Sequence, residues 1–320
     1  MIVRDILLKA NDLSVSFGSF NVLRNINLEI KKGEIFGVIG VSGVGKTTLL
    51  VALTGLINPD SGVVSFDFGR GLINIKKNKR TFLTYKSLIG FSTQESSFYP
   101  ELTVLQNLQY FASLYGLKRS VAEENIKKVL DVVGLYDFKN TLASKLSGGM
   151  QKRLDIACSI IHRPLLLFLD EPTADLDPIM RTRIWDLITR INKSGTTVVV
   201  ASHFLDELEV VCDRVAILNN KTINLVGSVA DLRRAYSSDK EVHVITNLAR
   251  YDPIIKGLRG DSSLGVKFAR VVDNKLVIIT SDLNKTLPKL LSLVGKEGDV
   301  VLKVEVKEPS IKEIFESIVG

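Results

Sequence analysis

One stretch near the amino terminus limits the folds open to this chain more than any other: an apolar strand that ends in a glycine-rich loop. Ile35 to Ile39 is continuously apolar, and a helical pattern runs from Thr48 to Leu56. The sequence between them reads Gly40-Val41-Ser42-Gly43-Val44-Gly45-Lys46-Thr47, which is the spacing of a phosphate-binding P-loop. Glycines let the backbone curl so that successive N–H groups face phosphates, and the helix N-terminus adds partial positive charge. The stretch therefore predicts a strand, a phosphate-binding loop and a helix in an α/β protein.

The side chains of this loop suit a bound nucleotide. Lys46 can neutralise terminal phosphates, and the Thr47 hydroxyl can bind Mg²⁺. The alternative is an ordinary glycine-rich turn, which the lysine, the threonine and the preceding strand together disfavour. We therefore expect ATP and Mg²⁺ as cofactors. The predicted nucleotide-binding residues of this region are Gly40, Val41, Ser42, Gly43, Val44, Gly45, Lys46, Thr47 and Thr48.

A second apolar strand, Leu165 to Leu169, ends in two carboxylates, Asp170 and Glu171. Adjacent side chains of a strand point to opposite faces, so the two acids have different tasks. Asp170 suits the Mg²⁺ shell, and Glu171 can polarise an attacking water as the general base. The alternative is a solvated acidic turn before Pro172.

The net charge of +7 comes almost entirely from one segment. Residues 70–94 contain six Lys and Arg and no Asp or Glu, so the rest of the chain is nearly balanced. A broad nucleic-acid-binding face is therefore disfavoured, and we expect no nucleic-acid partner. The cationic residues of the segment are Arg70, Lys76, Lys77, Lys79, Arg80 and Lys86.

Cysteine use and hydropathy point to the cytoplasm. Cys158 and Cys212 lack metal-ligand spacing, and we expect reduced, packed thiols. The first residues, Met1 to Asp5, do not resemble a signal peptide. No apolar run approaches the roughly 18 residues that span a bilayer. We therefore expect a chain that is soluble by itself.

The apolar pattern predicts two domains. The first contains buried parallel strands in a doubly wound core, together with a helical insert from about residue 95 to 163. After Gly227 the order becomes strand, helix, strand, strand, helix, strand, which is that of a ferredoxin-like α+β domain. We place the domains at residues 1–230 and 231–320.

Two further motifs flank the acidic strand: Lys145-Leu146-Ser147-Gly148-Gly149-Met150-Gln151-Lys152-Arg153-Leu154 before it, and Pro172-Thr173-Ala174-Asp175-Leu176-Asp177-Pro178 after it. With the P-loop, they resemble the ATP-binding cassette (ABC) ATPases in order and spacing. The resemblance covers roughly residues 5–230 and implies a P-loop NTPase core with a helical subdomain.

The resemblance implies that two chains share each nucleotide. The family's Ser-Gly-Gly signature, here Ser147, Gly148 and Gly149, binds the ATP held by the opposite subunit. A hydroxyl, bare backbone N–H groups and a helix dipole suit a γ-phosphate. Asp177 in the following loop is assigned to the same shared site. A homodimer, or a heterodimer with a related ATPase, is implied, whereas a plain helix start is the alternative for Ser147 to Gly149.

Three more residues carry over from the family. Gln94 matches the loop glutamine that contacts Mg²⁺ and the attacking water, and His203 matches the switch histidine that binds the γ-phosphate and supports Glu171. Phe17 stands where a tyrosine usually stacks on adenine. A core position for Phe17, or a substitute role for Phe20, is the alternative. The other histidines, His162 and His243, are expected to be structural or solvated.

This chain departs from the usual family pattern in three places. Met150 stands where glutamine is commonest in the signature. Ala174 stands where serine is usual in the loop from Ala174 to Asp177, which the resemblance links to signalling across the dimer. The basic run from Lys76 to Arg80 is interpreted as a solvated hairpin tip, with contact to anionic lipid or to a permease loop as alternatives.

The spacing of Lys46 and Ser147 leaves no room for the coiled coil of DNA-repair relatives. Two features resemble ABC-2 type exporters related to daunorubicin-resistance ATPases: Ser202 to Leu218 and Glu308 to Phe315. The resemblance implies an ATPase subunit that powers a separate transmembrane permease from the inner face of the cell membrane. An importer ATPase with a regulatory C-terminal domain, or a non-transport ABC ATPase, is the alternative.

Overall fold

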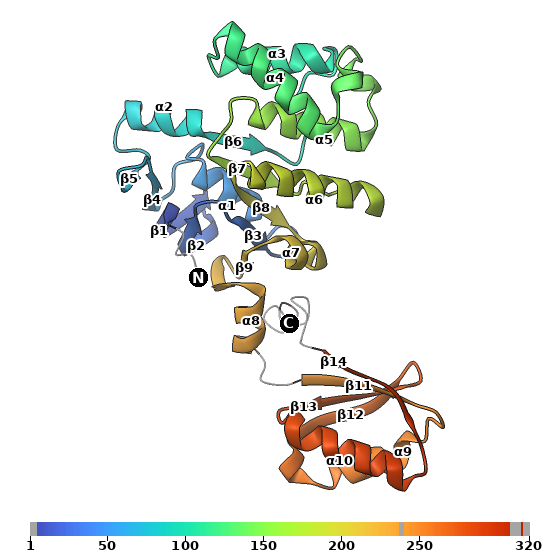
Figure 1. The fold of residues 1–320 in the computed structure, drawn as a ribbon. Coiled ribbons are helices and arrows are strands. Elements are labelled where there is room, and N and C mark those ends of the chain that lie inside the picture. The colour runs from blue at the N-terminus through green and yellow to red at the C-terminus, as the bar shows by residue number, and fades with distance from the viewer. Residues whose placement is uncertain (1–4, 237–239, 308–314, 316–320) are drawn as a thin grey trace. The chain divides into compact units, whose positions relative to one another are not determined.

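The computed structural model describes residues 5–236, 240–307 and 315 (Figure 1). The chain divides into two compact units, Met1–Ser228 and Val229–Gly320. Apart from the buried Phe315, the exporter-like segment from Glu308 to Phe315 lies outside the described residues.

The first unit is built on a six-stranded sheet in the order β10-β9-β3-β8-β7-β6. Neighbouring strands from β9 to β6 are parallel, and β10 is antiparallel at the edge. Every residue of β3, β7 and β8 is buried, as the continuous apolar runs require of strands covered on both faces. The strands are β3 (Ile35–Ile39), β6 (Ile89–Ser92), β7 (Leu166–Asp170), β8 (Thr197–Ser202), β9 (Arg214–Asn219) and β10 (Thr222–Gly227).

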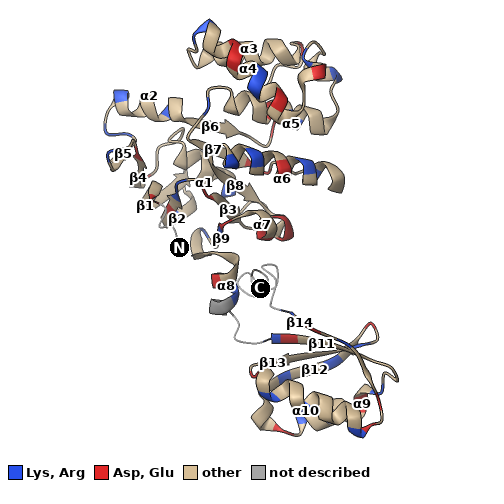
Figure 2. Cartoon of the chain, viewed as in Figure 1, with Lys and Arg blue, Asp and Glu red and all other residues tan. Residues whose placement is uncertain are grey.

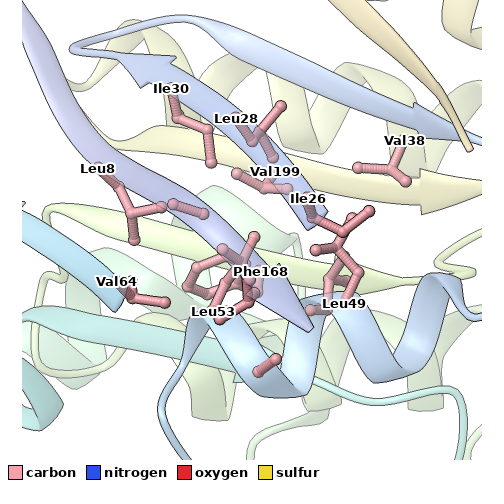
Figure 3. Packing of buried hydrophobic residues seen from close by; sticks show 14 of the residues in the cluster. Leu8, Ile26, Leu28, Ile30, Val38, Leu49, Leu53, Val64, Phe168 and Val199 are labelled. Atoms are coloured by element: carbon pink, nitrogen blue, oxygen red, sulfur yellow. The ribbon is translucent and has the colours of Figure 1, made fainter. Parts of the chain in front are cut away.

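A second, antiparallel sheet packs over the helix that follows the P-loop. Its order is β2-β1-β4-β5, from β1 (Ile6–Phe17), β2 (Phe20–Lys31), β4 (Ser61–Asp67) and β5 (Leu72–Asn74). Figure 3 shows Leu49 and Leu53 of α1 (Lys46–Leu53) among side chains of both sheets, with Leu8 and Ile26 from one and Phe168 from the other. Burial between two sheets fixes α1, and so fixes the direction of its N-terminus.

The helical insert contains three α-helices, α3 (Val104–Leu114), α4 (Arg119–Val133) and α5 (Gly148–Ile160). Thr103 and Gln106 form a capping box at the start of α3, and Gly134 ends α4 in the left-handed conformation. The remaining helices of the first unit are α2 (Lys79–Leu88), α6 (Pro178–Lys193) and α7 (Leu205–Val211). Among the described residues, no helix combines the length and the apolar composition needed to cross a membrane.

The interpretation of the basic run as a hairpin tip is wrong. The run instead forms a turn after β5 and the first turn of α2. Asn78 caps this helix, because its side chain accepts a hydrogen bond of 2.9 Å from the Thr81 N–H.

The second unit contains α8 (Val229–Tyr236) and a four-stranded antiparallel sheet in the order β12-β13-β11-β14. Its helices α9 and α10 cover one face of this sheet and contribute Ile254 and Leu290 to a separate core. The order is that of a ferredoxin-like domain, as the sequence pattern predicts. The elements are β11 (Lys240–Thr246), α9 (Tyr251–Arg259), β12 (Val266–Val272), β13 (Lys275–Thr280), α10 (Leu283–Lys296) and β14 (Val301–Lys307).

Candidate nucleotide-binding site

A cavity of about 550 Å³ opens at the carboxyl ends of β3, β7 and β8, where parallel α/β sheets bind ligands. It gathers residues from the P-loop, the β1–β2 turn, the loop after β6 and the ends of β7 and β8. The lining residues are Phe17, Phe20, Val22, Ser42, Gly43, Gly45, Lys46, Thr47, Thr48, Gln94, Glu171, Ala174 and His203.

The P-loop has the backbone of an anion site. Gly45, at φ 110°, is the N-cap of α1 and supplies no side-chain cap, so the first N–H groups of the helix remain available. At Gly40 a Cβ atom would lie 2.5 Å from Val44 Cγ1 and 2.9 Å from the Leu218 carbonyl oxygen. Glycine is therefore required where the loop leaves β3.

Lys46 is held inside the loop rather than in solvent. Its side chain is 7% exposed, and Nζ donates to the carbonyl oxygens of Gly40 at 2.9 Å and Val41 at 3.3 Å. The same Nζ lies 3.1 Å from Glu171 Oε1. These contacts fix one positive charge at the floor of the cavity.

Glu171 connects the lysine to the histidine predicted as the switch residue. Glu171 Oε2 lies 2.8 Å from His203 Nδ1. The Glu171 backbone adopts φ 47°, a left-handed conformation that is unfavourable for a residue with a Cβ, and its N–H donates to Ala201 O at 2.9 Å. The end of β8 therefore holds Glu171 in a strained position from which its carboxylate reaches both Lys46 Nζ and His203 Nδ1.

Asp170 lies near Glu171 and Lys46, and its carboxylate suits a divalent cation. Its carboxylate is buried and accepts a hydrogen bond from the Thr47 side chain, whereas Oδ1 has no hydrogen-bond partner among the described residues. Burial raises the pKa of Asp170, and the hydrogen bond from Thr47 opposes that shift. A buried carboxylate oxygen without a partner, next to a threonine hydroxyl, is a donor set that suits Mg²⁺.

Gln94 reaches the cavity from a segment anchored to α5. The buried Asp155 accepts a hydrogen bond from the Ser92 hydroxyl. It also accepts two hydrogen bonds from Ser97, one from the N–H and one from the hydroxyl, each at 2.8 Å. Lys152 Nζ donates to the Thr93 carbonyl oxygen at 2.9 Å. Both flanks of Gln94 are thus tied to the helix that begins at Gly148.

Sequence reasoning missed Lys152 and Asp155. Burial lowers the pKa of Lys152, while the charges of Asp155 and Asp170 oppose that shift. The available signal was a pair of opposite charges three residues apart in a helix whose later residues are all apolar or small.

The predicted signature residues do not line this cavity. Ser147 caps α5 by accepting from the Met150 N–H at 3.4 Å, and Ser147 and Gly148 are exposed. Asp177 likewise caps α6, accepting from the N–H groups of Ile179 and Met180 at 3.0 Å. Within one chain, therefore, Ser147, Gly148, Gly149 and Asp177 remain outside the group formed by Lys46, Asp170, Glu171, Gln94 and His203.

Phe17 and Phe20 face each other across the β1–β2 turn and both line the cavity. Phe17 is 56% exposed and Phe20 is 65% exposed, so the alternative that Phe17 belongs to the core is wrong. Lys221 Nζ lies 5.1 Å from the centroid of the Phe20 ring. Both rings are placed to stack on an aromatic base.

A cluster of Phe204, Arg181 and Glu207, also missed by sequence reasoning, packs next to His203. The Phe204 ring lies 4.1 Å from the His203 ring and 3.8 Å from the guanidinium of Arg181. Arg181 also donates to the Leu176 carbonyl oxygen at 2.8 Å and pairs with Glu207 at 3.4 Å. The same Glu207 accepts from Thr173 and Trp185, each at 2.8 Å, so it links the loop after Glu171 to α6 and α7.

The other two histidines lie outside the cavity, in structural settings. His162 is largely buried, stacks on Tyr115 at 3.5 Å, and burial lowers its pKa to about 4. His243 pairs with Glu241 on β11.

Comparison with known proteins adds the family context. Residues 23–174 match the family described as ABC transporter. The linearmycin resistance ATP-binding protein of Bacillus subtilis is 28% identical over 314 residues, which cover 98% of each chain. The methionine import ATP-binding protein of Carboxydothermus hydrogenoformans is 37% identical over 209 residues, covering 65% of this chain and 61% of that protein. Among solved structures, cbiO1 from Clostridium perfringens, part of the ABC transporter complex cbiONQ, is 29% identical with a TM-score of 0.65, covering 70% of this chain and 89% of its own.

Proposed function

Because the chain belongs to the ATP-binding proteins of ABC transporters, whose ATP hydrolysis is coupled to transport, we propose that it hydrolyses Mg-ATP in the described cavity to drive export. The family uses ATP, and its transporter subunits work with transmembrane permease subunits.

The phosphate-binding part of the proposal rests on the P-loop and on Asp170. The free N–H groups at the start of α1 and the Nζ of Lys46 would hold the β- and γ-phosphates. Thr47, Asp170 and Gln94 are the residues that would hold Mg²⁺, directly or through water. When bound, Mg²⁺ neutralises charge on the phosphates and helps to orient them for in-line attack.

One observation carries the catalytic assignment: Glu171 lies within 3.1 Å of Lys46 and 2.8 Å of His203. The γ-phosphate would compete with Glu171 for the positive charge of Lys46. The released carboxylate could then accept a proton from the attacking water, while His203 keeps it oriented. Phe17 and Phe20 would hold the adenine at the outer wall.

A two-chain site is supported by the exposed signature. Ser147 and Gly148 lie at the N-terminus of α5, away from their own chain's cavity, and a Cβ atom at Gly148 would have no neighbour within 4 Å. A second copy could therefore approach this helix start with its bound phosphates. We propose a head-to-tail homodimer with two such sites.

Export is favoured over import by the extent of the similarity. The resistance protein aligns over 98% of the chain, so the alignment includes the second unit, whereas the methionine import protein aligns over 65% of it. A separately encoded permease would be the membrane-spanning partner, and the chain would act from the inner face of the membrane.

The test is ATP binding and hydrolysis by the purified chain. Lys46→Ala should weaken ATP binding and abolish hydrolysis, and omission of Mg²⁺ should abolish hydrolysis by the unaltered chain. Lys127→Ala, which removes an exposed lysine from α4, is the control and should change neither. Unaltered ATP affinity in the Lys46 variant, measured by calorimetry, would overturn the site.

A further inference from the structure

The strongest unexplained feature outside the nucleotide site is a cationic surface on α2 and the turn before it. This basic face consists of Lys76, Lys77, Lys79, Arg80, Leu83 and Lys86, all of them exposed. Figure 2 shows Lys and Arg along this turn and helix without an intervening Asp or Glu. It lies on the first unit, and neither the P-loop nor the signature uses it.

The cations of the basic face are not neutralised within the part of the chain that the structure describes. None of the five forms an ion pair with a carboxylate there, although ion pairs occur on several other helices and strands of the chain. Lys76 instead bonds neutral oxygens of Ile57 and Asn58. Lys76 and Lys86 both approach the Phe82 ring, at 5.6 Å and 4.7 Å from its centroid. Partial desolvation of its ammonium and the nearby charge of Lys86 lower the pKa of Lys76.

The position of the charges opposes the stability of the helix. Lys79 and Arg80 occupy the first turn of α2, which contains no acidic residue. The N-terminus of a helix carries partial positive charge, so cations there are unfavourable. Helix formation does not explain this placement, and an external anion would relieve it.

An apolar residue stands at the centre of the face. Leu83 is 56% exposed, and its neighbours three and four positions away include Lys79, Arg80 and Lys86. Tyr85 points the opposite way: its ring is fully buried against Phe66, and its hydroxyl donates to the Leu53 carbonyl oxygen at 2.8 Å. The helix is therefore anchored on one side, while a leucine within a ring of cations projects from the other.

We propose that the basic face binds the surface of anionic phospholipid bilayers. Dispersed cations around one exposed leucine suit a layer of phosphate headgroups, where the leucine can enter the boundary with the acyl chains. The charge complementarity does not require a pocket. The proposal is independent of ATP hydrolysis, because binding to lipid requires neither Lys46 nor Glu171.

The test is co-sedimentation of the purified full-length chain with vesicles. The chain should bind vesicles that contain phosphatidylglycerol and should not bind phosphatidylcholine alone, and added salt should weaken the binding. The double variant Lys79→Glu/Arg80→Glu should lose at least about tenfold in apparent affinity. The variant Leu83→Ser should lose part of the affinity even at low salt. All variants should hydrolyse ATP in solution at the unaltered rate.

A matched variant separates this surface from the effect of overall charge. Lys118→Glu/Lys127→Glu makes the same change in net charge at exposed positions at the start of α4 and within it. If both double variants lose affinity equally, net charge alone is responsible and the proposal is wrong. Absence of vesicle binding by the unaltered chain would also overturn it. In that case, loss of co-purification with a co-expressed permease in the Lys79/Arg80 variant would assign the face to the permease.

Discussion

Glu171 Oε1 lies 3.1 Å from the Nζ of Lys46, so the proposed general base is paired with the lysine proposed to hold the phosphate. Both side chains are largely buried, and a buried ion pair is sensitive to a competing charge. A phosphate that reaches Lys46 would therefore weaken the hold on Glu171 at the moment when a base is needed. This coupling links substrate binding to activation of the water.

Replacing Glu171 with Gln should separate binding from hydrolysis. The amide keeps the size of the side chain but removes both the base and the negative charge that competes for Lys46. We expect ATP binding to be retained or strengthened, and hydrolysis to fall by roughly 10²–10⁴-fold. Nucleotide titration and a steady-state phosphate-release assay measure the two effects. Glu123→Gln on α4, an exposed glutamate, is the control; wild-type turnover in the Glu171 variant would refute the assignment.

Replacing His203 with Ala should reduce turnover while leaving ATP affinity nearly unchanged. His203 bonds Glu171 at 2.8 Å, and its loss would leave the carboxylate free to turn toward Lys46 alone. We expect roughly a 10²-fold loss of the hydrolysis rate at saturating ATP. His162→Ala is an unsuitable control because that residue is largely buried, so His243→Gln in the second unit serves instead. A rise in KM without a change in the maximal rate would contradict the role given to His203.

Replacing Asp170 with Asn should raise stability and abolish Mg²⁺-dependent hydrolysis. Burial raises the folded-state pKa of Asp170 above its unfolded value, so keeping the carboxylate ionised at neutral pH costs stability. The amide removes that cost and can still accept the hydrogen bond from Thr47. We expect a gain of about 1–3 kcal/mol in the free energy of unfolding at pH 7 without Mg²⁺.

The pH dependence of that gain has a definite sign. As the pH falls through the raised folded-state pKa, the wild-type carboxyl becomes neutral in the folded protein and its penalty shrinks. The stability difference between Asp170→Asn and wild type should therefore decrease toward acid and vanish below the unfolded pKa. Denaturant unfolding at several pH values measures it. A difference that grew toward acid would show that Asp170 is stabilised as a carboxylate without a cation.

Local sequence was sufficient for the strands and loops that hold the phosphate site. The P-loop spans consecutive residues, and the apolar runs of β3 and β7 are followed directly by Gly40 and by Asp170 and Glu171. Local sequence therefore predicted that the P-loop and the two carboxylates lie at one sheet edge. The order of strands and helices likewise predicted the sheet of the second unit. Whether the named residues act as proposed stays a prediction.

Contacts between residues far apart in the chain could not be predicted from local sequence. Asp155 meets Ser97 across a separation of 58 residues, and Glu207 meets Thr173 across 34. Such pairs depend on how helices cross the sheet, which periodicity does not determine. The error at the basic run had a local cause, since Asn78 could have been read as a helix cap before Thr81. A tight turn places the Phe17 and Phe20 rings on the same side of the cavity, which the position of either residue in the sequence does not determine.

Replacing Ser147 with Arg should stop hydrolysis in trans. The variant chain has an intact cavity of its own, so it should bind ATP with unaltered affinity as a monomer. Mixed with Lys46→Ala chains, it should form heterodimers that hold one intact composite site and one site with both defects. We expect hydrolysis in the mixture and little in either variant alone, as measured by phosphate release. Full activity of the Ser147 variant by itself would exclude the shared-site arrangement.

Replacing Asp155 with Asn should impair the action of Gln94, although Asp155 itself does not line the nucleotide cavity. Asp155 is fully buried and binds the segments on both sides of Gln94 through Ser92 and Ser97. The neutral amide weakens these hydrogen bonds and deprives Lys152 of a nearby charge, so we expect a loss of about 1–3 kcal/mol in stability. ATP affinity should be nearly constant, and the maximal rate of hydrolysis should fall.

A double-mutant cycle distinguishes this positioning role from a general loss of stability. Gln94→Ala should lower the maximal rate by itself, and Asp155→Asn should have little further effect in that background, because both changes act through the same side chain. The cycle is measured at a temperature where every variant is folded by circular dichroism. Independent, multiplicative losses in the double variant would show that Asp155 supports the fold of the helical insert and does not position Gln94.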